Sequence, residues 1–300
     1  MIDNPPTTSG LQGKNQMKYF SFVATALAAF LASCGTHIES ELPGLEGPYM
    51  GQTPPGRTAE VFAPGIISTE GWELQAVFAP GMKEFYYVTS GSEQERPKIS
   101  ELKPTIFGYR FENNQWRKFL EMPRTGEPFI TADGQTMHLA KGYRTRTDEG
   151  WSEVEGLGPM FERDDWGIMR LTASTDGFYV FDDFRSGDVI RGSRIVEGER
   201  QDPVELPEQI NSGEFTAHPF IAPDESYLIW DSEREGGYGE SDLYISFRQT
   251  DGSWGPAINM GPEVNSDKDD FYARVTPAGQ FLMIDRTLAR TDDYIEVDIY

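Results

Sequence analysis

The chain has 300 residues, a formal net charge of −23, 38% hydrophobic residues and 13% aromatic residues. This apolar content can build a folded core and excludes a chain that is disordered throughout. The negative charge disfavours binding to nucleic acid and direct attraction to anionic lipid, because both depend on Lys and Arg.

The N-terminal region has the pattern of an export signal. From Met17 the chain reads MKYFSFVATALAAFLASCG, in which one Lys precedes an apolar stretch from Phe20 to Leu31. That stretch is shorter than the roughly 20 apolar residues that a membrane-spanning helix needs, and it is typical of a secretory signal. We therefore interpret residues 1–33 as a signal peptide, and the part before Met17, residues 1–16, as a candidate for a mis-assigned start.

Cys34 is the only cysteine of the chain. The residues LASC that end in it resemble the bacterial lipoprotein box, in which the cysteine is lipidated and becomes the mature N-terminus. The resemblance implies lipidation of Cys34 and, because Gly35 and not aspartate follows, an outer-membrane location facing the periplasm or the cell surface. A buried structural cysteine is the alternative. Residues 34–56, rich in Gly, Pro and Glu, are predicted to be a lipidated tether.

One strand-and-turn pattern recurs through residues 57–300. Its clearest copy has strand-like segments FTAHPFIA (215–222), YLIWDSE (227–233) and DLYISFRQ (242–249), followed by WGPAINMG (254–261). The first turn of each copy falls near residue 80, 133, 176, 224 or 278. Intervals of about forty to fifty-five residues suit the four-stranded blades of a β-propeller. We predict an all-β fold with one propeller of five blades, or six if one copy is too degenerate to recognise; a β-sandwich is the alternative.

The last copy ends at Tyr300, directly after its third strand, and the missing segment has a match near the start of the repeat region. FAPGI (62–66) aligns with WGPAI (254–258). We therefore predict that residues 57–67 form the fourth strand of the last blade and close the ring. Closure of this kind leaves no unpaired sheet edge between the first and last blades.

The repeat, behind a lipoprotein box, resembles the TolB-like bacterial propellers with WD40-like Pro-Asp repeats. The residues that carry it are Pro223-Asp224-Glu225-Ser226, YLIWDSE, DLYISFRQ and TDGSW. The resemblance implies a non-catalytic propeller at the cell envelope. We interpret the Pro223–Ser226 segment as a turn, because Pro suits its first corner and Asp and Ser bond to its backbone. Trp116, Trp151 and Trp254 occupy equivalent repeat positions and are expected to pack between blades.

Several acidic residues are candidates for chemistry. The adjacent pairs Asp164–Asp165, Asp182–Asp183, Asp269–Asp270 and Asp292–Asp293 cannot grip one substrate from a strand, where neighbours face opposite sides. We expect most of them to be solvated at loops and strand ends. The catalytic alternative is a glycosidase, in which two carboxylates flank a sugar at the central channel. Its candidates, on inner strands or their entry loops, are Glu73, Glu127 and Glu214.

No cofactor is expected from the sequence. His138 and His218 lack zinc-site spacing, and NSDKDD (265–270) leaves only an irregular calcium site as an alternative. We predict a lipid-anchored envelope propeller that acts as a non-catalytic binding or scaffolding module. Its expected partner is an envelope protein or peptide. The alternative is a carbohydrate-active enzyme or glycan-binding propeller with its site at the central channel.

Overall fold

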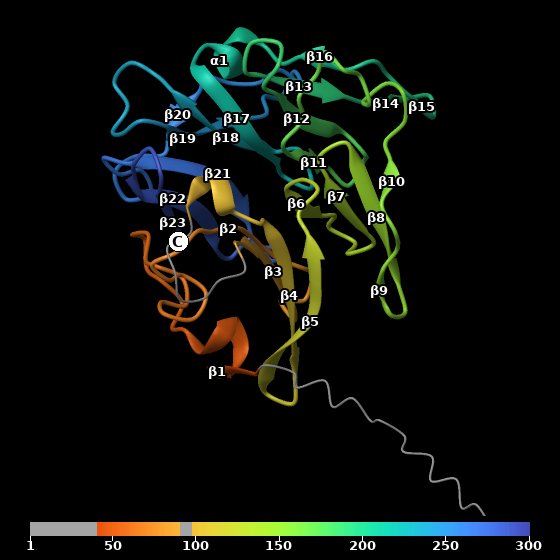
Figure 1. Cartoon of the computed structure of the whole chain (residues 1–300). Helices are drawn as coiled ribbons and strands as arrows, with labels where there is room; N and C mark the ends of the chain where they lie inside the picture. The colour runs from red at the N-terminus through yellow and green to blue at the C-terminus, as the bar shows by residue number, and fades with distance from the viewer. Residues whose placement is uncertain (1–40, 91–97) are drawn as a thin grey trace, which may run out of the picture. The chain divides into compact units, whose positions relative to one another are not determined.

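The computed structural model describes residues 41–90 and 98–300. These residues form five antiparallel blade sheets and a separate two-stranded hairpin, and strands of each blade sheet contact strands of the next, as a five-bladed β-propeller requires (Figure 1). The predicted fold class is confirmed. The predicted signal peptide and Cys34 lie outside the described residues.

Each blade begins with its innermost strand and continues outward through hairpins. Blade 1 contains β2 (Glu73–Phe78), β3 (Glu84–Thr89), β4 (Thr105–Glu112) and β5 (Gln115–Pro123), with β1 (Glu41–Glu46) added at its outer edge. Blade 2 contains β6 (Pro128–Ile130), β7 (Thr136–Leu139), β8 (Gly142–Thr147) and β10 (Glu155–Gly156), and β9 (Gly150–Trp151) also pairs with β8.

Blades 3 to 5 follow the same order. Blade 3 contains β11 (Leu171–Ala173), β12 (Tyr179–Asp183), β13 (Val189–Ser193) and β16 (Val204–Glu205), with a side hairpin of β14 (Ile195–Val196) and β15 (Glu199–Arg200). Blade 4 contains β17 (Glu214–Ile221), β18 (Tyr227–Glu233), β19 (Asp242–Phe247) and β20 (Ile258–Asn259). Blade 5 contains β21 (Asp269–Val275), β22 (Leu282–Arg290) and β23 (Ile295–Ile299). The described helices are short: η1 (Pro48–Gly51), η2 (Ile99–Glu101) and α1 (Glu208–Asn211).

The segment Pro223–Ser226 is the turn between β17 and β18, as predicted. The backbone N–H and the hydroxyl of Ser226 both donate to Asp224 Oδ1, at 3.0 and 2.6 Å. Glu225 has a φ of 61° and its N–H donates to the carbonyl of Ala222. These bonds are local to the corner, so the Asp224 carboxylate stabilises a chain reversal.

Ring closure occurs at the predicted place but without the predicted strand. Blade 5 has three strands, and the free edge of β23 is covered by residues 62–72. Phe62 N–H donates to the Ile299 carbonyl at 2.8 Å, and Val297 N–H donates to the Gly71 carbonyl at 3.2 Å. Residues 57–67 are not a strand, because Ala63 and Gly65 have φ values of 44° and 75° and Pro64 has no N–H for a ladder.

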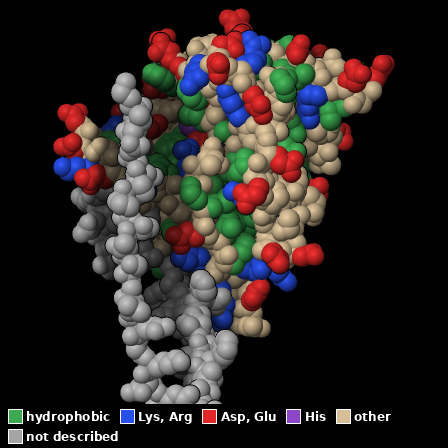
Figure 2. Space-filling view, turned by 45° about the vertical axis from the view of Figure 1, so that its right-hand side comes forward, with side chains coloured by type: hydrophobic (Ala, Val, Ile, Leu, Met, Phe, Trp, Pro, Cys, Tyr) green, Lys and Arg blue, Asp and Glu red, His purple; other side chains and the backbone are tan. Residues whose placement is uncertain are grey.

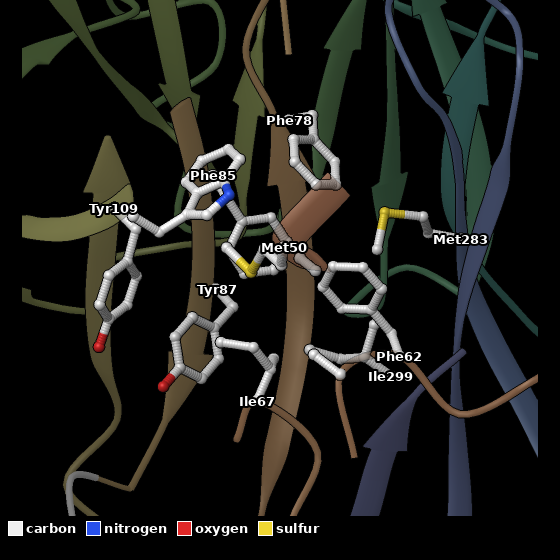
Figure 3. Packing of buried hydrophobic residues seen from close by; sticks show 12 residues of the cluster. Met50, Phe62, Ile67, Phe78, Phe85, Tyr87, Tyr109, Met283 and Ile299 are labelled. Carbon is white, nitrogen blue, oxygen red and sulfur yellow. The ribbon is translucent and has the colours of Figure 1, made fainter. Parts of the chain in front are cut away.

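The closing segment is held by apolar packing. Figure 3 shows the cluster, which combines side chains of the N-terminal segment, blade 1 and blade 5: Met50, Phe62, Ile67, Phe78, Phe85, Tyr87, Tyr109, Met283 and Ile299. The rings of Phe62 and Phe85 lie 5.3 Å apart. The cluster therefore joins the first and last blades through side chains where the backbone ladder is incomplete.

Contacts with the propeller begin well before residue 57, where the sequence analysis placed its start. Strand β1 pairs with β5, and Met50 is only 3% exposed. Gly47 accepts a hydrogen bond from the indole Nε1 of Trp116 at 3.0 Å. Residues 41–56 are thus part of the propeller unit and not a free tether, because burying Met50 and adding a strand stabilise them against blade 1.

The three tryptophans at equivalent repeat positions pack as predicted. Trp116 and Trp254 are 1% and 6% exposed. Trp151 of blade 2 donates its indole N–H to the hydroxyl of Tyr86 in blade 1, at 3.1 Å. These side chains are therefore committed to the packing of blades and are not available as a sugar-stacking platform.

Candidate functional site

The five inner strands place one residue each at the same register position. In every blade, a backbone N–H after the inner strand donates to the carbonyl that begins the second strand; the donors are Ala79, Thr131, Ser174, Ala222 and Thr276. The residue four positions before each donor is polar. We call these five residues the central ring: Gln75, Glu127, Arg170, His218 and Tyr272.

The central ring closes the channel with hydrogen bonds that join different blades. Gln75 Nε2 donates to Glu127 Oε1 at 2.7 Å, from blade 1 to blade 2. Arg170 Nη1 donates to the Ala273 carbonyl at 2.9 Å, and Tyr272 Oη donates to the Pro128 carbonyl at 2.9 Å. The last two bonds connect blades that are not neighbours, so the ring residues meet at the centre and form a polar plug.

Three aspartates connect successive blades beneath the ring. Each lies at the same position of a second strand and accepts the backbone N–H of a ring residue in the next blade. The pairs are Asp182 with His218 at 3.1 Å, Asp231 with Tyr272 at 3.1 Å, and Asp285 with Gln75 at 2.7 Å. We call Asp182, Asp231 and Asp285 the inter-blade aspartates.

Backbone bulges make these bonds possible. Gln75, His218 and Tyr272 have φ values of 59°, 46° and 53°, and the register with the second strand shifts at each of them. A bulged residue leaves the ladder of its own blade, so its N–H is free for another acceptor. Positive φ is costly for residues other than glycine. Each carboxylate therefore stabilises a strained residue and joins two blades.

Three members of the adjacent aspartate pairs are buried, although we predicted that most would be solvated. Asp182, Asp183 and Asp270 are 1%, 0% and 0% exposed, so these members are core residues and not solvated ones. Their neighbours do face opposite sides: Asp182 accepts from the ring, whereas Asp183 pairs with Arg191 at 2.9 Å. Burial is tolerated because backbone N–H groups and arginines satisfy the carboxylates. The pairs at 164–165 and 292–293 are exposed, as expected.

His218 lies between two carboxylates. Its Nδ1 is 3.0 Å from both oxygens of Asp231, and its Nε2 is 3.6 Å from Glu127 Oε1. Burial alone would lower the pKa of His218, but the negative charges of Asp231 and Glu127 outweigh it and raise the pKa to about 10. The ring therefore contains an imidazolium, and burial raises the pKa of the neighbouring Asp182 to about 6.

The three predicted acids occupy different surroundings. Glu127 belongs to the central ring, where its Oε1 accepts bonds from Gln75 and Arg124 and its Oε2 has no hydrogen-bond partner. Glu73 is 3% exposed and accepts from the N–H and the hydroxyl of Thr69, and burial raises its pKa to about 7. Glu214 is exposed at the start of β17. Across residues 41–90 and 98–300, no hydrogen bond or ion pair joins any two of them.

Neither the central ring nor the inter-blade aspartates have a local motif, so they were not predicted from the sequence. The available signal was positional. An Asp ends each of the segments YVFD, LIWD and LMID, at the same distance from the preceding turn. Polar residues recurring at one position of an otherwise apolar strand repeat indicate a shared buried role.

No metal centre is formed by the described residues: no group of three or more His, Cys, Asp or Glu in them could hold an ion. In the NSDKDD segment, Asp270 pairs with Arg286 and Asp269 with Arg290. His138 is 2% exposed, and burial lowers its pKa to about 4, so it is a neutral core residue. Within the described ranges, no helix has the length and apolarity needed to cross a bilayer.

Comparisons with known proteins give distant structural similarity. The sequence matches no protein-family profile and no curated protein sequence. Among solved structures, TolB from Acinetobacter baumannii matches at 14% identity with a TM-score of 0.43, over 76% of this chain and 54% of that one. An endo-arabinase from Bacteroides thetaiotaomicron matches at 13% identity and 0.45, over 75% and 92%.

A periplasmic gluconolactonase from Pseudomonas aeruginosa is also similar, at 11% identity with a TM-score of 0.42, over 74% of this chain and 70% of that one. This chain spans about half the length of the TolB structure (54%). The endo-arabinase and the gluconolactonase are named for different activities, and at these levels of similarity none of the three proteins indicates what this chain binds or whether it catalyses a reaction.

Proposed function

We propose that this chain is an exported, lipid-anchored β-propeller of the cell envelope that binds a protein or peptide partner and does not catalyse a reaction. The observation that supports it is the polar plug. Every residue of the central ring has a hydrogen bond or a backbone partner in another blade. A ring whose polar groups hold the blades together is a rigid scaffold.

The plug also argues against the glycosidase alternative. Glu127 and Asp231 contact the two different nitrogens of the His218 imidazole, which lies between their carboxylates. A glycosidase needs the space between its two catalytic carboxylates for the scissile bond and, in inverting enzymes, for a water molecule. Both oxygens of Asp231 lie within hydrogen-bonding distance of His218, and one also accepts from Tyr272.

A protein partner has a candidate contact at the end of the channel opposite the first-hairpin turns. Phe215 lies at the start of the inner strand β17 and is 58% exposed. Exposed aromatic residues are enriched at protein interfaces. On the face shown in Figure 2, Asp and Glu side chains are interspersed with Lys and Arg. We expect docking on Phe215 to use the exposed apolar ring of this residue.

The anchoring part is tested by fractionation. The full chain and a Cys34→Ala variant are expressed in a bacterium with a labelled fatty acid, and membrane and soluble fractions are separated. We expect label and membrane association only with Cys34. Equal fractionation of the two proteins would contradict lipidation.

The binding part is tested with the detergent-solubilised full chain as bait in an envelope extract. We expect a specific envelope protein to be retained by the wild type and by Phe247→Ala, but lost with Phe215→Ala. Phe247 is a matched control because it is also exposed, at 47%, and ends the third strand of the same blade. In parallel, a glycan-hydrolysis screen is run; turnover that disappears in Glu127→Gln would replace the binding proposal with the enzyme.

A further inference from the structure

A cavity of about 110 Å³ lies beside the central ring. It opens at the turns between first and second strands, where Ala132, Pro223 and Pro277 are exposed. Its walls are mostly apolar and come from all five inner strands and from β22; they include Val77, Phe129, Ala173, Phe220, Ile221 and Met283. Glu127 and His218 do not line it, so this cavity is separate from the His218–Asp231–Glu127 cluster.

Among the described residues that line the cavity, only two arginines are charged. Arg170 is fully buried and Arg274 is 4% exposed. The whole chain carries 49 Asp and Glu against 26 Lys and Arg, yet the described residues that line this cavity include no acid. A cavity with this charge in so acidic a protein is electrostatically suited to a negatively charged ligand.

Both arginines leave the same edge of the guanidinium unused. Arg170 Nη1 donates to the carbonyls of His218 and Ala273, and Arg274 Nη1 donates to Tyr272 O and Asp285 Oδ1. In each residue Nε and Nη2 are buried and have no hydrogen-bond partner. Within one guanidinium group, the Nε and Nη2 donors lie along the same edge and match the two oxygens of a carboxylate.

The positions of the two guanidinium groups are fixed by the plug. The Cζ atoms of Arg170 and Arg274 lie 3.9 and 5.1 Å from the centroid of the Tyr272 ring. Burial lowers the pKa of Arg274, the negative charge of Asp285 raises it, and the positive charge of Arg170 lowers it. Asp285 pairs with Arg274 at 3.0 Å and compensates one of the two positive charges, so one further anion that contacts both guanidinium groups would compensate the other. The site is therefore preorganised and pays little ordering cost on binding.

We propose that this cavity binds a carboxylate with a short apolar body, with the carboxylate held by Nε and Nη2 of Arg170 and Arg274 and the body against the apolar walls. This site goes beyond the proposed protein contact, because the cavity opens at the first-hairpin turns and Phe215 lies at the other end of the channel. A cavity of roughly 150 Å³ holds benzene, so about 110 Å³ suits a body of four or five carbons. The carboxylate belongs either to a free acid or to the C-terminal residue of a peptide.

The experiment compares ligands that differ only in charge. Binding of 4-methylpentanoate and of its uncharged amide to the wild-type full chain is measured by calorimetry at pH 7. A short peptide ending in Leu is measured with a free and with an amidated C-terminus. We expect at least one carboxylate to bind at least tenfold more tightly than its amide, and the better of the two identifies the source. Equal affinity of acid and amide, or no binding of either acid, would overturn the proposal.

Two variants locate the site. Ala173→Leu reduces the volume of the cavity and leaves both arginines in the sequence. Arg274→Lys keeps a positive charge but loses the paired Nε and Nη2 donors. Each variant should weaken carboxylate binding at least tenfold. Ala278→Leu, at an exposed turn position outside the cavity, should bind as the wild type does. Circular dichroism confirms that each variant is folded. Unchanged binding in folded Ala173→Leu would place the ligand elsewhere and contradict the proposal.

The carboxylate-binding experiment and the capture of an envelope protein can succeed or fail independently of each other. If Phe215-dependent capture of an envelope protein occurs and neither acid binds, this inference fails and the binding module stands. If an acid binds as described and no protein is captured, the proposed protein partner is contradicted and the cavity site stands.

Discussion

The inter-blade aspartates should be individually important for stability, and Asp231 gives the clearest test. It is 3% exposed, its Oδ1 accepts the N–H of Tyr272, and its carboxylate contacts the ring of His218. Substitution of Asp231 by Ala removes the hydrogen bond to the next blade. It also leaves the His218 imidazolium in the interior without its closest counter-charge.

The magnitude follows from these two losses. A hydrogen bond to a charged group contributes about 1.5–3 kcal/mol, and breaking a buried ion pair costs about 3–5 kcal/mol. One carboxylate makes both contacts, so the two costs overlap and we expect Asp231→Ala to lower the free energy of unfolding by about 3–5 kcal/mol. For a domain of this size, that corresponds to a melting temperature lower by about 6–20 °C.

Thermal and urea unfolding at pH 7 measure this effect. Asp231→Asn keeps an acceptor for Tyr272 and should lose less stability than Asp231→Ala. Asp165→Ala is the matched control, because the Asp165 side chain is 62% exposed and pairs only with an exposed Arg163; it should leave the melting temperature unchanged. If Asp231→Ala melts together with Asp165→Ala, the aspartate does not hold the blades together.

Three further predictions concern stability. The folded-state pKa of His218 is raised from 6.5 to about 10. The stabilising contribution of His218 is therefore complete below pH 6.5 and is lost as pH rises through 10. The free energy of unfolding should fall between pH 6.5 and pH 10 in the wild type but not in His218→Gln. The folded-state pKa of His138 is lowered from 6.5 to about 4, so its contribution is lost as pH falls through this range. Relative to His138→Phe, the wild type should lose about 3 kcal/mol between pH 7 and pH 4, and parallel pH curves would contradict a buried neutral imidazole. Phe62 is buried in the closing cluster, so Phe62→Ala should lower the free energy of unfolding by about 3–5 kcal/mol in urea titrations. Phe184→Ala, at a residue that is 44% exposed, should have little effect. Equal unfolding midpoints for the two variants would refute closure of the ring through Phe62.

Strand order and blade number were predictable because they depend on local patterns. Each hairpin is encoded by apolar runs that meet at a short turn, and the five turns near residues 80, 133, 176, 224 and 278 all exist in the structure. The closing segment was predictable in place but not in conformation. Its sequence resembles a strand, yet Pro64 and the positive φ of Ala63 and Gly65 break the ladder, and packing of Phe62 substitutes for it.

The candidate site was predictable only in part. Glu127 was found as an acid near an inner strand, but its neighbours His218 and Asp231 are 91 and 104 residues away in the sequence. Burial of Asp182 and Asp270 was not expected, because adjacent acids are ordinarily solvated. Their carboxylates form hydrogen bonds and ion pairs with backbone N–H groups and arginines from other parts of the chain. These partners cannot be identified from the residues adjacent in sequence.

The sequence by itself determined an all-β chain of five repeated hairpins, since alternation of apolar runs and turns is a short-range property of the backbone. It also carries the pattern of an export signal that ends at Cys34. Only the tertiary structure decided which polar residues meet at the axis. Arg170 and Arg274 come from blades 3 and 5, and they share one cavity because the ring brings their inner strands to a common centre. That convergence is a long-range property, and the proposed carboxylate site depends on it.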